Sequence, residues 1–426
     1  MMSLNNFLSS NEDGVFYTGH ASLIARLSGK NYIFDYIRDN KPYGDLWVFF
    51  PELTKDIPWE KIDGIFISHV HQDHYDPVML KTLNIPVYII GGRPPFEEVL
   101  KKDGITYNVI PPNIKYEIDS GVYVYGVLHH SNGVDASCYM GNENFSIYHG
   151  NDNYTDNVSL SVIAKEFGSV DVACVPYAYI NWYPQLLENL NEAERELESE
   201  RLVSKYYDYA IEQANILNAK RVIPFGANLT YNDNSRSALN LECKTPLDFQ
   251  DYVANKYGET EEGRFKAIFS GDVIVSRNNK LIEFSADKYD KESYRDLMQV
   301  YLDSLGKTNT ISAEMRAHDD EFNKNPNVNL KEKTPYPHLV IVGHSSTPKA
   351  IAINTFDSTV NTVLVDDLHE IKMPLTFIRI KDAKLFTDWT NGEVRLEEVI
   401  GSRKFSIFRS PNLYDEKVQY LINTQL

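Results

Sequence analysis

The chain has 426 residues, of which 42% are hydrophobic and 12% aromatic, so it can bury a large core. This composition excludes a fibrous or disordered protein, and a formal net charge of -18 argues against broad binding to nucleic acid. The three cysteines lack disulfide or zinc-finger spacing, no apolar run approaches the ~18 residues that span a bilayer, and the polar N-terminus lacks the apolar stretch of a signal peptide. We therefore expect a cytoplasmic enzyme with no membrane span and no nucleic-acid partner.

Short apolar segments punctuated by glycine open the chain and predict the strands of one meander, at residues 14–17, 21–27 and 31–34. A loop rich in proline and glycine follows, and residues 65–67 form the next apolar strand. From residue 77 the pattern alternates between short helices at 77–83 and 96–102 and strands at 87–90, 121–128, 146–149 and 170–175. Such alternation is typical of an α/β fold.

The second half of the chain changes character along its length. Residues 186–218 are charged and helical in pattern, with a solvated face, and residues 221–225 predict a strand after that helix. Another strand is expected within residues 265–274. Beyond residue 287, charged helical segments mix with short strands. We therefore expect an α/β catalytic domain at 1–287 and a C-terminal α+β extension at 288–426.

The densest group of metal-capable side chains lies in residues 68–74, directly after the apolar run 65–67. It contains His69, His71, Asp73 and His74. Imidazole and carboxylate together are ligands that suit zinc, iron or manganese. Because alternate residues of an extended chain point to one side, His69 and His71 can face one pocket while Asp73 and His74 turn to a second. The competing interpretation, histidines placed by chance on a solvated loop, is disfavoured by the density of ligands.

Two more predicted strands are followed by metal-capable residues. His129 and His130 end one strand, and Asp152 lies in the polar turn after another. Because α/β folds build sites at the ends of strands, we expect these residues to converge on the first group. An Asx-turn is the structural alternative for Asp152, since asparagines flank it on both sides.

The segment 69–74 resembles the signature of the metallo-β-lactamase superfamily. Members stack two β-sheets between helices and hold one or two metal ions at the sheet edge, which implies a four-layer αββα sandwich here. Residues 17–22, together with Phe34 and Asp35, resemble the branch that contains N-acylphosphatidylethanolamine phospholipase D and ascorbate-6-phosphate lactonase. The motif at 69–74 is specific for the superfamily and much less specific for the reaction, and the segments at 17–22 and 34–35 are weaker motifs.

A further likeness, to the metallo-β-lactamase-like part of CMP-N-acetylneuraminate hydroxylase, would cover most of the chain. It rests on residues 224–226, 396–399 and 408–414. That family also carries a Rieske iron–sulfur domain, marked by paired cysteines and histidines that this sequence lacks. Oxygenation would then need electrons from another protein, from a reductant or from the substrate itself.

Carried over by position, the superfamily's ligands form two pockets for two divalent metal ions. His69, His71 and His129 would make the first pocket, with His130 as the competing ligand. Asp73 and His74 would belong to the second pocket, and Asp152 would bridge both ions. The resemblance leaves the metal open among zinc, iron and manganese.

The last ligand of the superfamily, usually a histidine after the strand 221–225, has no counterpart, because no histidine lies between His149 and His318. Asn228 or His149 could fill that place. His20 and Asp35 are expected to orient ligands rather than to bind the metal.

A metal ion held by imidazoles and carboxylates lowers the pKa of bound water from near 16 to roughly 7. The favoured prediction is therefore a hydrolase of a small-molecule ester, lactone, amide or phosphodiester, in which metal-bound hydroxide attacks and Asp73 or Asp152 orients it. The alternative is a di-iron oxygenase that oxidises a small molecule with dioxygen, with an electron-donor protein as a possible partner. A metal-binding protein without catalysis is a third possibility, suggested by the missing last histidine.

The substrate is only hinted at by aromatic residues. Those at 177, 179, 182 and 183 follow a strand end and could line a pocket, or could be ordinary packing in a chain with 28 tyrosines. Gly91-Gly92-Arg93 lacks the spacing of nucleotide-binding glycine-rich loops. We expect no cofactor other than metal.

Overall fold

The computed structural model divides the chain into two compact units. The first comprises residues 1–129, 134–180 and 200–307, and the second comprises residues 130–133, 181–199 and 308–426. The residues whose structure is described are 2–38, 42–43, 46–129, 135–232, 239–240, 243–285, 289–305, 330, 332–424 and 426. The domain boundary predicted between residues 287 and 288 lies outside the described residues and stays a prediction.

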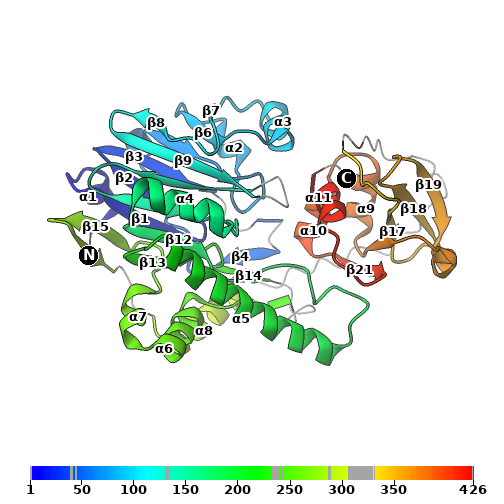
Figure 1. Ribbon diagram of the computed structural model, residues 1–426. Coiled ribbons are helices and arrows are strands. Elements are labelled where there is room, and N and C mark those ends of the chain that lie inside the picture. Colours follow the sequence, from blue (N-terminus) through cyan, green and yellow to red (C-terminus); the bar gives the residue numbers. More distant parts are fainter. Residues whose placement is uncertain are drawn as a thin grey trace. The chain divides into compact units, whose positions relative to one another are not determined.

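The first unit contains a mixed sheet, the first sheet, whose order across the described residues is β16-β15-β1-β2-β3-β5-β6-β7 (Figure 1). Its antiparallel part confirms the predicted meander and consists of β1 (Gly14–Gly19), β2 (Ser22–Leu27) and β3 (Lys30–Phe34), continued by β15 (Val273–Arg277) and β16 (Lys280–Phe284). Its parallel part consists of β3, β5 (Gly64–Phe66), β6 (Val87–Ile90) and β7 (Asn108–Ile110). The metal-capable segment 68–74 therefore follows the C-terminal end of a parallel strand.

A second sheet of the same unit has the order β13-β12-β11-β10-β9-β8 in the described part of the chain. Its strands are β8 (Tyr116–Asp119), β9 (Val122–Leu128), β10 (Ala136–Gly141), β11 (Ser146–His149), β12 (Val172–Pro176) and β13 (Arg221–Phe225). Strands β8 to β11 pair antiparallel, whereas β11, β12 and β13 are parallel. Strand β10 is absent from the sequence-based prediction, and it completes a hairpin with β9.

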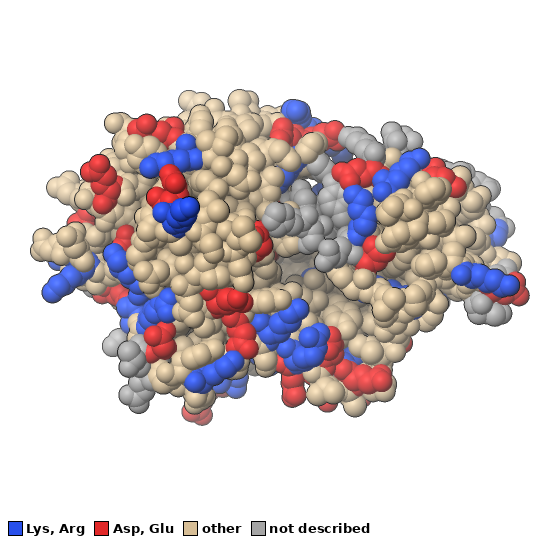
Figure 2. Space-filling model, viewed as in Figure 1, with Lys and Arg blue, Asp and Glu red and all other residues tan. Residues whose placement is uncertain are grey.

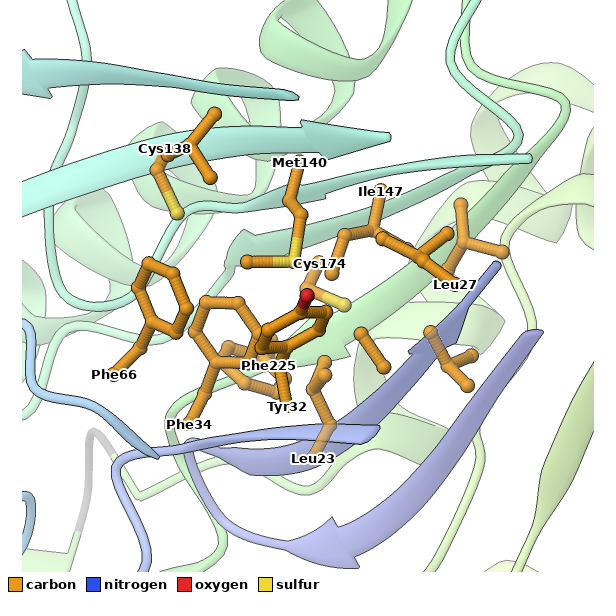
Figure 3. Close-up of a cluster of buried hydrophobic side chains, with 14 of the residues drawn as sticks. Leu23, Leu27, Tyr32, Phe34, Phe66, Cys138, Met140, Ile147, Cys174 and Phe225 are labelled. Atoms are coloured by element: carbon orange, nitrogen blue, oxygen red, sulfur yellow. The ribbon is translucent and has the colours of Figure 1, made fainter. Parts of the chain in front are cut away.

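The core between the two sheets follows the two-residue period of the strands. In β9, Val122 and Val124 face the first sheet, whereas Tyr125 and Val127 face the opposite side. Figure 3 shows the inward-facing set, in which side chains of both sheets meet: Tyr32, Phe34, Phe66, Met140, Ile147, Cys174 and Phe225. This close packing fixes the strand ends that carry the candidate site.

Helices cover the outer face of the second sheet and complete the αββα sandwich. α4 (Asn157–Phe167), α5 (Glu192–Ile216) and α6 (Pro246–Tyr257) bury apolar residues against Tyr148 and Val175 of that face. On the first sheet, Phe7 of α1 (Leu4–Leu8) packs against Phe16, with ring centroids 5.9 Å apart. Further elements of this unit are the strands β4 (Trp47–Phe49) and β14 (Leu229–Tyr231) and the helices η1 (Trp59–Lys61), α2 (Pro77–Leu80), α3 (Pro94–Lys102), α7 (Glu259–Arg264) and α8 (Lys291–Leu305).

The second unit is an α+β structure built on a third sheet, with the order β19-β18-β17-β20-β21 among the described residues. Its strands are β17 (Leu339–His344), β18 (Lys349–Asn354), β19 (Val360–Leu364), β20 (Leu375–Ile380) and β21 (Phe405–Ser410), and its helices are η4 (Val365–Glu370), α9 (Ala383–Thr390), α10 (Leu396–Ser402) and α11 (Glu416–Thr424). The segment 181–199 also belongs here, because the Glu188 amide donates to the Ile407 carbonyl at 2.7 Å. The helix predicted from residue 186 therefore begins only at Glu192.

The surface carries charges of both signs. On the face that Figure 2 shows, lysine and arginine side chains of the described residues lie among aspartates and glutamates rather than in one basic stripe. In the described part of the chain, no helix combines the length and the apolar character that a membrane crossing requires.

Candidate metal centre

The segment 68–74 leaves β5 through a tight turn that gathers its polar side chains. The amides of His74 and Tyr75 both donate to the His71 carbonyl, at 3.0 and 2.9 Å. Asp76 then caps α2 by accepting from the Met79 amide at 2.8 Å, and Pro77 occupies the first helical turn. His69 and His74 are fully buried as a result.

The first ligand group consists of His69, His71 and Asp135, whose candidate ligand atoms lie within 4.8 Å of one another. Nε2 of His69 lies 2.6 Å from Nδ1 of His71 and 3.4 Å from Oδ1 of Asp135. The other ring nitrogen of His69 faces Ser68 Oγ at 3.0 Å and the Asn151 amide at 3.4 Å. These contacts on Nδ1 leave Nε2 as the metal-facing atom.

Electrostatics keeps His69 in the form that binds metals. Burial lowers the pKa of His69 well below its ordinary value, and the nearby His71 and His74 lower it further. The imidazole is therefore neutral at physiological pH, as metal ligation requires.

The second ligand group is centred on His74. Its Nε2 lies 3.4 Å from Asp73 Oδ2 and 3.3 Å from Asp152 Oδ2, while Nε2 of His20 lies 3.2 Å from the same Asp73 oxygen. His74 also belongs to a group with His69 and Asp152, so it joins the two ligand groups. Burial opposes charge on His74, but the carboxylates of Asp152 and Asp73 outweigh it and raise the pKa of His74 well above its usual value. The surroundings of Nε2 thus attract positive charge.

Asp35 connects the end of β3 to both ligand groups. Its carboxylate accepts the Ser68 amide at 2.7 Å and the Ser68 hydroxyl at 2.5 Å, and it lies 3.1 Å from Nδ1 of His74. With the proton on Nδ1 of His74 held by Asp35, a metal ion could take the place on Nε2 of the second proton that Asp73 and Asp152 favour. This geometry suits the orienting role predicted for Asp35.

These residues fit a divalent metal ion. Nε2 of His74 and Nδ1 of His20 are buried and make no hydrogen bond within the described structure, although carboxylates surround the first of them. Buried imidazole nitrogens that converge with carboxylate oxygens are donors that zinc and iron accept. The two ligand groups share His74 and lie close together, since the ring centroids of His69 and His74 are 4.3 Å apart. One or two ions could be held here.

Three other predicted ligands make different contacts or lie outside the described residues. His149 is buried between Phe34 and Phe225, with ring centroids 4.7 and 4.8 Å away, and its Nε2 faces the Ala21 carbonyl at 3.1 Å. The amide of Asn228 contacts the Tyr17 hydroxyl at 3.4 Å. His130 lies outside the described residues.

His129 ends β9, and its backbone amide donates to the Asp135 carbonyl at 3.1 Å. Among the described residues it belongs to no group of three metal-capable side chains. Its assignment as a ligand, like that of Asn228, His130 and His149, stays a prediction.

Sequence reasoning missed Asp135. It immediately precedes β10, where Ala136 pairs with Leu128 of β9. Asp135 therefore lies opposite His129, one position beyond that pair. The signal was weak, because β10 (Ala-Ser-Cys-Tyr-Met-Gly) lacks a clear alternation of apolar and polar residues. His20 was considered only as an orienting residue, yet the geometry groups its ring with Asp73 and His74.

The aromatic residues at 177, 179, 182 and 183, considered above as a possible pocket lining, lie in different parts of the fold. Tyr177 is buried in the core, where its ring is stacked with that of Tyr207 and tilted against that of Phe249. Tyr179 packs on Tyr206, which also contacts Tyr154, two residues beyond Asp152. Trp182 and Tyr183 belong to the second unit.

Comparison with known proteins agrees with this architecture. A model of the beta-lactamase superfamily domain matches residues 14–225. A curated relative, a putative Rieske 2Fe-2S iron-sulfur protein of Mycolicibacterium smegmatis, is 23% identical over 167 residues, which are 35% of this chain and 31% of that protein. The match thus spans about a third of the relative's length, and the specific likeness to the sialic-acid hydroxylase stays a prediction.

Two solved structures resemble part of this chain at low identity. A metallo hydrolase of the archaeon Ignicoccus hospitalis is 15% identical, with a TM-score of 0.42, and the match covers 65% of this chain and all of that one. A diiron beta-hydroxylase of Streptomyces venezuelae is 17% identical, with a TM-score of 0.39, over 58% of this chain and 52% of that one. The domain match, the αββα sandwich and the histidine-aspartate clusters at its strand ends together identify the chain as a member of the metallo-β-lactamase superfamily.

Proposed function

We propose that this protein is a non-haem iron enzyme that oxidises a small molecule with dioxygen. The observation that carries the proposal is Asp135, which stands beside His69 and His71 where a third imidazole was expected. Two histidines and one carboxylate, with other positions open, are typical of non-haem iron oxygenases. Asp73 and Asp152 add two more carboxylates around His74 and support a second ion.

The chain's own residues would hold and shape this centre. Iron, when bound, supplies a redox-active centre at which dioxygen can be reduced. Asp35 holds the tautomer of His74, and the buried His69 stays neutral. The side chain of Asp152 is 34% exposed, in contrast to the buried imidazoles, so it marks the side from which a small substrate would approach.

The proposal also needs a source of electrons. The curated relative is named as a putative Rieske iron-sulfur protein, a class that carries electrons, and this supports an electron-donor protein as partner. Cys138 and Cys174 are buried within the core between the sheets and cannot serve as an accessible redox pair.

A second candidate function is hydrolysis of an ester, lactone, amide or phosphodiester at a zinc centre. Its support is the pair of carboxylates beside His74, because Asp73 or the more exposed Asp152 could orient a water molecule towards a substrate. A metal ion would supply the acidification of that water.

Metal analysis combined with two activity measurements separates these functions. The full chain is produced in medium supplemented with iron and zinc, purified without chelators, and tested for reductant-dependent oxygen uptake and for turnover of a panel of esters, lactones, amides and phosphodiesters. Bound iron with oxygen uptake that disappears on chelation supports the proposal. Stoichiometric zinc, turnover within the panel and no oxygen uptake with the iron-loaded protein would replace it by the hydrolase.

A further inference from the structure

Arg93 is a buried cation beside the metal-capable segment. It follows β6 and the pair Gly91-Gly92, it is 1% exposed, and it is the largest of the fully buried side chains among the described residues. A Cβ at Gly91 would lie 2.3 Å from Val109 Cγ1, and Gly92 has a φ of +85°, so glycine is required at both positions. A buried charge is costly unless it is paired and hydrogen-bonded, which makes its partners informative.

The guanidinium ties the end of β6 to the residue before His69. Nε and Nη2 donate to the Ile90 carbonyl at 3.0 and 2.7 Å, and Nη1 donates to the Ser68 carbonyl. The ring of Phe96 lies against the guanidinium, with its centroid 4.4 Å away. These contacts with Ile90, Ser68 and Phe96 hold this side chain in one place.

Ser68 is consequently held from both sides. Asp35 accepts its amide and hydroxyl, while Arg93 donates to its carbonyl. The hydroxyl of Ser68 also lies 3.0 Å from Nδ1 of His69. The direction of the chain into His69 therefore depends on one buried anion and one buried cation.

The positive charge of Arg93 is stabilised by the carboxylates of Asp135 and Asp35. Burial lowers the pKa of Arg93 to about 10, and the carboxylates of Asp135 and Asp35 oppose that effect. Arg93 remains protonated at neutral pH and attracts both carboxylates.

We propose that Arg93 is a positioning residue of the metal centre, which fixes the Ser68 carbonyl and thereby aims His69 at the metal. This inference rests on the metal centre of the proposed function and not on the reaction performed there. Loss of such an outer contact typically weakens metal binding about 10- to 100-fold.

The test compares full-length wild-type protein with Arg93→Met, Arg93→Lys and Arg26→Met. Each is stripped of metal and titrated with Co²⁺ against a competing chelator, with the cobalt absorption spectrum and the thermal midpoint recorded. Arg26 is a matched control because it is 7% exposed and donates to the Leu8 and Ser10 carbonyls at 2.9 and 2.8 Å. It pairs with Asn31 at the start of β3, whereas the metal-capable segment lies beyond the other end of that strand.

We expect Arg93→Met to bind Co²⁺ about 100-fold more weakly, with an altered spectrum, and Arg93→Lys about 10-fold more weakly, because lysine keeps the charge without the planar fork. Arg26→Met should lower the thermal midpoint and leave Co²⁺ binding unchanged. If Arg93→Met does not fold, the lysine variant carries the test.

Unchanged or tighter Co²⁺ binding by the folded Arg93 variants would overturn the proposal, as would an equal loss in Arg26→Met. Wild-type protein that binds no Co²⁺ would overturn the metal centre and with it the proposed function. The two failures are therefore distinguishable.

Discussion

Replacing Asp35 by asparagine tests how the protein prepares His74 for metal. One oxygen of Asp35 accepts the Ser68 amide, and the other faces both the Ser68 hydroxyl and Nδ1 of His74. In Asp35→Asn, the amide NH₂ would replace the second oxygen and donate to Nδ1 of His74. The proton of the imidazole would then move to Nε2, the nitrogen that must face the metal.

The change of tautomer should weaken metal binding. Outer contacts of this kind are worth about 10- to 100-fold in metal affinity, or about 1.4 to 2.7 kcal/mol. A further loss of stability of about 1 to 3 kcal/mol is expected, because buried donors around residue 35 lose their acceptor. Metal affinity is measured by chelator competition, and stability by urea denaturation of the metal-free protein.

Asp171→Asn provides a matched control. Asp171 is also buried and accepts the amide and hydroxyl of a serine, Ser146, at 2.9 and 3.2 Å, but at the start of β11 rather than at its metal-facing end. We expect a comparable loss of stability with wild-type metal affinity. Wild-type affinity in Asp35→Asn, or an equal loss of affinity in Asp171→Asn, would refute the reasoning.

Three further predictions concern the candidate metal ligands, the dependence of stability on pH and the packing around Gly126. Asp135→Ala should reduce the bound metal measured by mass spectrometry, while His129→Ala should retain it; the reverse result would restore the ligand set implied by the family resemblance. Burial favours a higher pKa for Asp248, but hydrogen bonds from Lys291 and Thr245 outweigh burial and lower that pKa. The contribution of the Asp248 carboxylate to stability is therefore present above the unfolded pKa of about 3.9 and is lost as the pH falls through the folded pKa. In urea denaturation, the stability difference between wild type and Asp248→Asn should therefore shrink from pH 7 to pH 3, and a difference that does not depend on pH would contradict this. Gly126→Ala should cost about 1 to 3 kcal/mol, because the new Cβ would lie 2.4 Å from Ile90 Cδ1. Gly263→Ala, in α7 with no atom within 4 Å, should be neutral or slightly stabilising; equal losses in the thermal midpoint would contradict the packing argument.

Local patterns made much of the fold predictable. The apolar segments of the N-terminal meander and the strand before His69 carry their own periodicity, and the structure confirms them as β1, β2, β3 and β5. The metal-capable side chains of residues 68–74 also lie close together in the structure, because a tight turn keeps residues that are neighbours in sequence close in space. Strand β10 and the late start of α5 had no such local signal.

By itself, the sequence determined the superfamily and the segment that is rich in metal-capable side chains, since these depend on residue types within a few positions of one another. Only the tertiary structure decided which distant residues join them. Asp135 arrives through the pairing of β9 with β10, whereas His149 shares the inward face of β11 with Ile147 and is buried among aromatic rings. Strand register is a long-range property, because it depends on a partner strand, and for that reason Asp135 could be added to the candidate ligands only from the folded chain.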